Sequence, residues 1–116
     1  MKKFFALFLI PHAVMENWRK TTPPEQMKTA SEDMMKAWQK WMKDHEKILA
    51  DHGGPLGKTK RVTAQNISDA RNDLGGYVIV EAESHEAAAK IFVGHPHFMI
   101  PEASIEVMEI PSVPGM

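Results

Sequence analysis

Two short runs of the chain are apolar at every position rather than at every second one. They extend from Phe4 to Ile10 and from Tyr77 to Val80. Because successive side chains of a strand point to opposite faces, an uninterrupted apolar run is typical of a strand that is covered on both sides. We therefore predict that these two segments are the central strands of one sheet.

A long amphipathic helix is predicted between these strands. Thr22 is the expected N-cap, Pro23 lies in the first turn, and Glu25 follows as in a capping box. Apolar residues then recur along one helical stripe: Met27, Met34, Trp38, Trp41, Met42, Ile48 and Leu49. Gly53 and Gly54 provide a left-handed stop, so the predicted helix runs roughly from Pro23 to His52.

Two further strands and a second helix complete the predicted pattern. The polar, lysine-bearing stretch from Leu56 to Thr63 suits an edge strand, and residues 65–73 are rich in turn formers and predict an exposed connection. Ser84 is the expected N-cap of a short helix that ends at Gly94. The alternation from Ala103 to Ile110 predicts the last strand.

The predicted order of elements is β-α-β-β-α-β, which is typical of an α+β, ferredoxin-like fold with a four-stranded antiparallel sheet. A chain of 116 residues fits one domain, 1–116. Both helices of this fold lie on one face of the sheet, so apolar side chains on the other face of the central strands need cover. Two-fold pairing of sheet faces is the simplest cover, and it predicts a homodimer.

Composition and charge exclude several classes of protein. Lys and Arg number 14 and Asp and Glu 15, for a net charge of -1. No broad cationic field results, so we expect neither nucleic acid nor a membrane as a partner. The absence of cysteine excludes disulfides, thiolate catalysis and cysteine-ligated metal. Met1 to Ile10 resembles a secretory signal, but its apolar run is short and lacks a nearby cleavage site, so we expect a cytoplasmic protein with a buried strand there.

Several segments carry a resemblance to a known family. They are Pro24 to Met27, Trp38 to Met42, Gly54 to Leu56, Leu74 to Ser84, His95 with Pro96, and Ile105 to Val107. Together they resemble the YCII-related family, and in particular its DGPF-type branch of small dimeric α+β barrel proteins. The resemblance implies one YCII-related domain that pairs with a second copy. Two features differ from the family pattern. Ile67 to Arg71 stands where the DGPF-type branch has the tetrapeptide that names it. Ala37 or Trp38 stands where YCII members have a histidine in the first helix.

His45 is the leading candidate for acid-base chemistry. It falls on the apolar stripe of the predicted first helix, near Trp41 and Ile48. A histidine there would be placed to transfer protons in a pocket between helix and sheet. The alternative is a hydrogen-bonded histidine at the margin of the core.

His95 and His97 are further catalytic candidates. They flank Pro96, and an extended loop would bring the two rings together. His12, at the end of the first predicted strand, would then be a third ligand for a metal ion. Because this spacing matches no specific ligand motif, we expect no metal.

The predicted ligand-binding residues are His12, Trp38, Trp41, Met42 and Tyr77. Indoles and thioethers adapt to flat apolar molecules, although core packing explains such a stripe equally well. A cleft between the first helix and the sheet is the expected ligand site. Two hypotheses follow: a non-catalytic dimeric module that binds a small apolar metabolite, or a cofactor-free enzyme of the lyase or isomerase type that uses a histidine for proton transfer.

Overall fold

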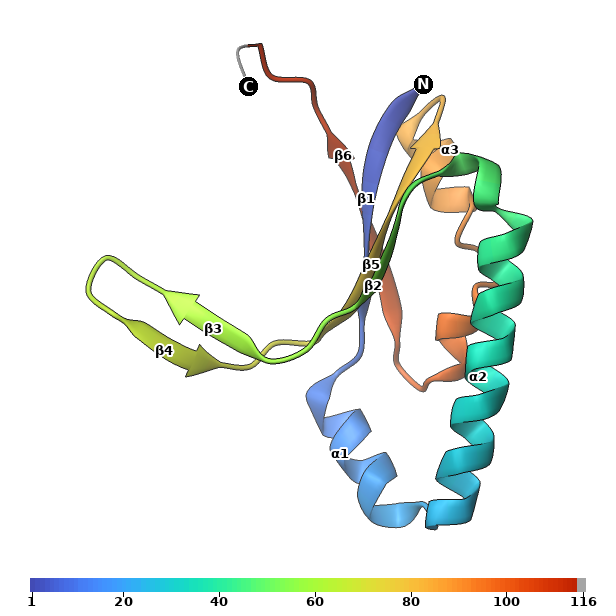
Figure 1. Ribbon diagram of the computed structural model, residues 1–116, viewed down its shortest axis with the longest axis vertical. Coiled ribbons are helices and arrows are strands. Elements are labelled where there is room, and N and C mark those ends of the chain that lie inside the picture. The colour runs from blue at the N-terminus through green and yellow to red at the C-terminus, as the bar shows by residue number, and fades with distance from the viewer. Residues whose placement is uncertain (115–116) are drawn as a thin grey trace.

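The central sheet of the protein has four antiparallel strands, and two helices cover one of its faces (Figure 1). The computed structural model describes residues 1–114. In chain order the elements are β1 (Lys2–Leu9), α1 (His12–Thr21), α2 (Pro24–Asp44), the 3-10 helix η1 (Glu46–Ile48), β2 (Leu49–Pro55), β3 (Thr59–Val62), β4 (Ile67–Ala70), β5 (Leu74–Ala82), α3 (His85–Lys90), the 3-10 helix η2 (Pro96–Met99) and β6 (Ser104–Ile110). The strand order of the sheet is β2-β5-β1-β6.

The two inner strands are β1 and β5, as their unbroken apolar runs predict. Phe4 lies opposite Val80, and Ala6 lies opposite Val78. These four side chains are buried on the face that α2 and α3 cover. The α+β, ferredoxin-like fold is therefore confirmed.

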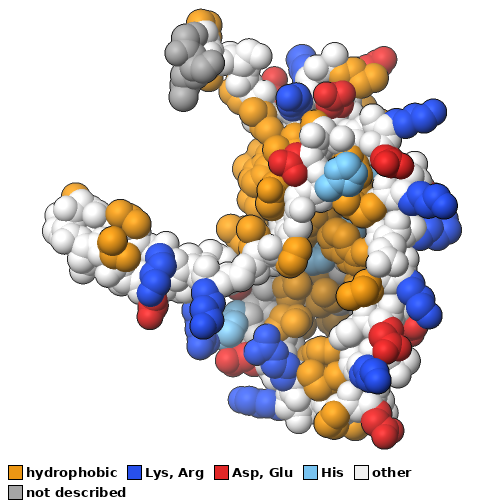
Figure 2. Space-filling model, viewed as in Figure 1, with side chains coloured by type: hydrophobic (Ala, Val, Ile, Leu, Met, Phe, Trp, Pro, Cys, Tyr) orange, Lys and Arg blue, Asp and Glu red, His pale blue; other side chains and the backbone are white. Residues whose placement is uncertain are grey.

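The opposite face of the sheet has no helix over it (Figure 1). Phe5 on β1 lies opposite Ile79 on β5 and Met108 on β6, so the three side chains share this face. Leu7 and Tyr77 form the next cross-strand pair. Figure 2 shows hydrophobic side chains gathered in the hollow between the C-terminal segment and the β3–β4 hairpin. We call this surface the bare face.

The first long helix is shorter than predicted. It ends at Asp44, His45 is its C-cap, and the chain enters β2 at Leu49. Leu49 pairs with Val80 of β5, so a residue assigned to the helical stripe belongs to an edge strand. The prediction of a helix to His52 was wrong because no helix-breaking residue precedes Gly53, and pairing with a distant strand overrode the local periodicity.

The edge strand predicted from Leu56 to Thr63 was also placed wrongly. Its centre forms β3, which pairs with β4 in a separate two-stranded sheet and not with the four-stranded one. The predicted connection 65–73 is exposed, but it contains β4. The hairpin projects from the body on the side opposite α2 (Figure 1).

Helix boundaries follow the local chemistry only in part. Pro23, not Thr22, is the N-cap of α2, and it makes no side-chain capping bond. At α3 the prediction was right, since Ser84 Oγ accepts a hydrogen bond from the Ala87 backbone N–H at 3.1 Å. No helix was predicted for the segment that forms α1. Within residues 1–114, no helix is both long and apolar enough to cross a bilayer.

Gly53→Ala should destabilise the fold, whereas Gly54→Ala should not. Gly53 has φ of 61°, and a Cβ there would lie 1.7 Å from the Tyr77 carbonyl oxygen, while a Cβ at Gly54 would meet nothing within 4 Å. The left-handed backbone and the clash with β5 together should cost at least about 2 kcal/mol. Urea unfolding of the matched pair measures this. Equal unfolding midpoints would contradict it.

Candidate functional site

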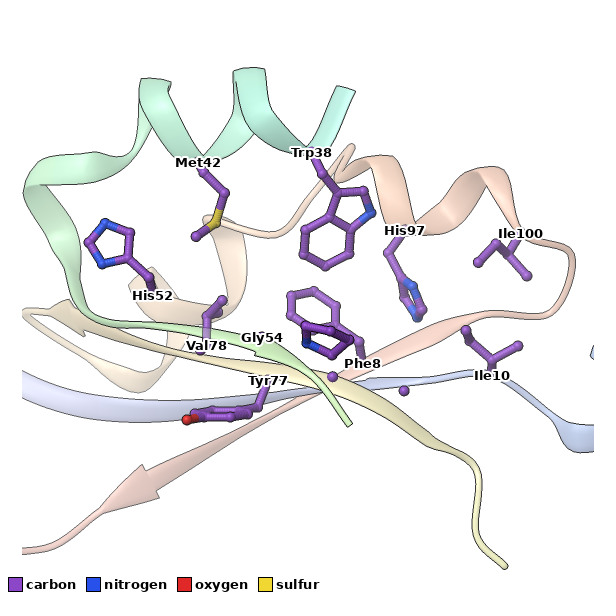
Figure 3. A pocket seen from close by; sticks show the side chains of 14 residues that line it. Phe8, Ile10, Trp38, Met42, His52, Gly54, Tyr77, Val78, His97 and Ile100 are labelled. Atoms are coloured by element: carbon purple, nitrogen blue, oxygen red, sulfur yellow. The ribbon is translucent and has the colours of Figure 1, made fainter. Parts of the chain in front are cut away.

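A pocket of about 450 Å³ lies between α2 and the sheet. Trp38 and Met42 point from α2 toward Phe8 and Val78 on the inner strands (Figure 3). Phe8 and Val78 are almost fully buried, and the two rings of Phe8 and Trp38 meet edge to face at 4.6 Å between centroids. The walls of the pocket are therefore mainly aromatic and aliphatic.

One wall of the pocket is backbone, where β2 runs close to β5. A Cβ at Gly76 would lie only 3.1 Å from the Gly54 carbonyl oxygen. Glycine in β5 therefore allows the two strands to approach here, at the segment from Gly75 to Tyr77. This places peptide groups, rather than side chains, at the surface of the pocket.

His97 is the buried polar side chain of the pocket wall. Its Nε2–H donates to the carbonyl oxygens of Leu9 at 2.9 Å and Ser104 at 3.1 Å. Because carbonyls only accept, this arrangement fixes the neutral tautomer, and Nδ1 is left with a lone pair. Burial lowers the pKa of His97, although the two backbone hydrogen bonds oppose the shift. The ring is thus a neutral hydrogen-bond acceptor at neutral pH.

His95 lies behind the pocket wall rather than on it. Its Nδ1 accepts a hydrogen bond from the His97 backbone N–H at 2.9 Å, so the neutral ring carries its proton on Nε2. That Nε2 is buried and has no hydrogen-bond partner among residues 1–114. The aromatic rings nearest to the His95 ring are those of Trp38 and Trp41, each 4.5 Å away between centroids. His95 therefore positions η2, as its N-cap, instead of facing a ligand.

The pKa of His95 is lowered to about 3, first by burial and then by the neighbouring His97 and His45. Protonation would also turn the Nδ1 acceptor into a donor that faces a backbone N–H. His95 consequently stays neutral across the physiological range.

His45, the leading catalytic candidate, lies at the C-cap of α2. Its Nδ1–H donates to the Trp41 carbonyl oxygen at 2.8 Å, and its ring stacks on the Trp41 indole at 4.3 Å between centroids. His45 is not among the described residues that line the pocket. The structure therefore matches the alternative of a hydrogen-bonded histidine at the margin of the core, and a catalytic role remains a prediction.

His12 lies elsewhere, at the start of α1 beside the base of the hairpin. Its Nε2 is 3.0 Å from Glu16 Oε1 and 2.8 Å from Arg71 Nη1. It lines a second, polar hollow together with Arg19 and Lys58. His12 is thus separated from the pocket that holds His97, and no group of three or more metal-ligating side chains occurs in the described chain.

The remaining predicted ligand residues divide between the pocket and its surroundings. Trp38 and Met42 line the pocket, whereas Trp41 is buried against Phe92 and His45. Tyr77 contributes to the pocket wall, but its ring lies on the other side of the sheet and packs against Phe5 (Figure 3). The structure brings His97, Trp38 and Met42 together, and leaves out His12, His45 and Trp41.

Three side chains at the two ends of the pocket were not predicted from the sequence. Ile10 and Ile100 lie at one end, and His52 lies toward the other (Figure 3). His52 was assigned to the helix and is on β2. Correct assignment of β2 would have identified His52, but the meeting of Ile10 with Ile100 depends on the path of η2 and carries no local signal.

Comparisons with known proteins give little further guidance. No family model matches the chain, and no curated protein matches it. One solved structure with a similar chain trace is 5-chloro-2-hydroxyhydroquinone dehydrochlorinase from Burkholderia phenoliruptrix AC1100, in complex with 2,5-dihydroxybenzoquinone. It is 15% identical, covers 91% of each chain, and has a TM-score of 0.48. At this TM-score the similarity establishes neither family nor function.

Stability should fall as the pH is lowered below neutrality, because His95 and His97 resist protonation in the folded state. Their folded pKa values lie below that of a histidine in the unfolded chain, so the unfolded state binds more protons as the pH falls from about 6.5. Each fully resistant histidine contributes a slope of up to about 1.4 kcal/mol per pH unit. Urea unfolding between pH 4 and 8 measures the slope.

His95→Phe keeps an aromatic ring and removes one titrating group, so its slope should be shallower than that of the unmodified protein. The slope, and not the absolute stability, is the readout, since the variant also loses the bond to the His97 backbone N–H. An unchanged slope would show that His95 does not resist protonation.

Proposed function

We propose that the protein is a homodimeric module of the YCII-related type that binds a small apolar molecule between α2 and the sheet. The observation that carries this proposal is the pocket that Trp38, Met42 and Phe8 surround, with His97 in its wall. Its volume of about 450 Å³ lies in the range of small-molecule sites. The family assignment is supported by the glycine-tyrosine segment of β5 and by the ferredoxin-like topology.

The chemistry of the pocket favours a largely apolar ligand with one hydrogen-bond donor. The aromatic and aliphatic walls offer no charge, and the buried His97 is neutral. The hydrogen bonds of His97 to Leu9 and Ser104 use Nε2. The other ring nitrogen, Nδ1, carries a lone pair in this tautomer, so it accepts a hydrogen bond and does not donate one. A ligand hydroxyl or N–H would donate a hydrogen bond to Nδ1 of His97, whereas a ligand carboxylate would be repelled by the Nδ1 lone pair.

The homodimer in this proposal forms through the bare faces of two sheets. Phe5, Leu7 and Ile79 lie on this face, together with Met108, which is 39% exposed. A contiguous apolar surface of this kind on an inner strand pair is typical of an interface, and closed two-fold dimers are the commonest assembly. The helices occupy the other face, so a second sheet is the matching partner in shape and polarity.

His97 also favours one alternative function. A neutral imidazole whose orientation two carbonyls fix is a suitable general base when its free nitrogen meets a bound substrate. In this alternative the protein is a cofactor-free lyase or isomerase, and His97 accepts the proton. His45 and His95 would support the helix and the η2 loop instead.

Trp38→Ala should weaken ligand binding about tenfold or more, because the indole supplies a large part of the apolar wall. The probe is N-phenyl-1-naphthylamine, an uncharged aromatic amine, titrated by fluorescence. Trp18→Ala is the matched control, since Trp18 is on α1 and does not line the pocket, and it should leave the affinity unchanged. Failure of the unmodified protein to bind the probe, or equal losses in both variants, would contradict the proposed pocket.

A deuterium-exchange measurement separates binding from catalysis. In the enzyme alternative, a bound compound with an acidic C–H exchanges it for deuterium in heavy water, which proton NMR detects. His97→Gln retains an amide donor for the Leu9 and Ser104 carbonyls, so it should still bind the compound and lose the exchange. Exchange at the same rate in the variant would exclude His97 as the base.

Ile79→Lys should convert the dimer to monomers, because it buries an unpaired charge at the centre of the bare face. Sedimentation velocity near 100 µM measures the assembly, and circular dichroism checks the fold. Met35→Lys is the control, since Met35 is on α2 and is 61% exposed. A monomeric unmodified protein at this concentration would refute the homodimer.

A further inference from the structure

The β3–β4 hairpin projects from the body of the protein as an arm. It extends on the side of the sheet opposite α2, which is the side of the bare face (Figure 1). The radius of gyration is 16.3 Å, whereas a compact domain of this length is expected near about 13 Å. The excess reflects a segment that does not pack on its own core.

The arm has little support within its own chain. β3 and β4 contact each other far more than they contact any other element in the described chain. An isolated two-stranded hairpin is at best marginally stable in water, because it has no second layer to bury its side chains. The arm therefore has little packing against the rest of the described chain.

The arm is nevertheless an ordered structure. Four cross-strand pairs join β3 to β4, from Thr59 with Ala70 to Val62 with Ile67. Its turn is closed by the Thr63 backbone N–H, which donates to the Asn66 carbonyl oxygen at 2.9 Å. Lys60 and Asp69 form an ion pair across the strands. Such preorganisation reduces the entropy lost on binding.

The outer end of the arm carries an apolar pair. Val62 and Ile67 lie opposite each other, so their side chains share one face of the hairpin. They are 73% and 70% exposed, and Figure 2 shows hydrophobic side chains at the outer end of the arm. Lysine and arginine on β3 oppose strand addition at that edge, so contact through this apolar pair is favoured.

We propose that this hairpin is a clasp that packs its Val62 and Ile67 onto the second copy of the chain. The inference rests on the homodimer of the proposed function. The arm extends on the same side of the sheet as the bare face (Figure 1). A second copy that packs on the bare face therefore lies next to the arm, and the arm contacts the side of that copy. By two-fold symmetry the partner's arm makes the same contact in return. Each dimer thus gains two identical apolar contacts outside the sheet interface.

The test measures dimer dissociation by sedimentation. Val62→Ser with Ile67→Ser should raise the dissociation constant about tenfold or more, because each protomer loses both apolar side chains of its arm contact. Both residues are mostly exposed within the chain, so the fold, checked by circular dichroism, should not change. The matched control is Val93→Ser, since Val93 is 80% exposed in the segment after α3. An unchanged dissociation constant in the double variant would overturn the clasp.

A second measurement locates the contact directly. The chain has no cysteine, so Ile67→Cys can be labelled alone with a benzophenone maleimide and irradiated. Covalent dimers are expected from this position and not from a label at Val93→Cys. Equal yields at both positions, or none at Ile67→Cys in a protein that sediments as a dimer, would overturn the clasp.

The two proposals fail in different ways. A monomeric unmodified protein overturns the dimer and the clasp together, but leaves binding in the pocket to be judged by its own titration. A dimer that Ile79→Lys dissociates and that the arm variant leaves intact overturns the clasp alone. Crosslinking of Ile67→Cys to an unrelated protein added in excess, with no covalent dimer, would show that the arm makes only non-specific contacts and would also overturn the clasp.

Discussion

The structure depends on two inner strands that are apolar on both faces while helices cover only one. Phe4, Ala6 and Phe8 of β1 are buried beneath α2 and α3, and Phe5 and Leu7 of the same strand face the other way. A strand cannot turn all of these side chains to one side, because successive residues alternate. The ferredoxin-like order fixes β1 and β5 in the centre, and so produces both a core and a second apolar surface from alternate residues of the same two strands.

The pocket and the bare face are two sides of one short stretch of backbone. The peptide at Tyr77 belongs to the pocket wall, while its ring packs on Phe5 on the opposite face. β2 comes close to β5 here, since a Cβ at Gly76 would lie 3.1 Å from the Gly54 carbonyl oxygen. Ligand binding on one face and assembly on the other would therefore act on the same few peptide groups.

Two neutral histidines define the chemistry at the inner side of the pocket. His95 holds the start of η2 through its Nδ1, and His97 joins the ends of β1 and β6 through its Nε2. Both are buried, and burial lowers the pKa of each. The result is a wall in which the imidazole of His97 is neutral and held in one orientation by two carbonyl groups. His45, the acid-base candidate singled out from the sequence, donates to the Trp41 carbonyl oxygen at the end of α2, and its catalytic role stays a prediction.

The sequence by itself determined the class of fold, the two central strands and the cap of α3. Unbroken apolar runs, strict alternation and a serine cap are local signals, and each acts within a few residues whatever surrounds it. Trp38 and Met42 were identified as pocket residues for the same reason, since a helical stripe shows which side chains face the sheet.

Only the tertiary structure decided where α2 ends, that Leu49 begins a strand, and that residues 59–70 form a separate arm. It also decided that His52 and His97, and not His45, line the pocket. The bonds of His97 join residues 88 positions apart, and the partner of Leu49 is on β5. These features depend on contacts between segments that are far apart in the sequence. The free energy of such contacts cannot be inferred from a local pattern of residues.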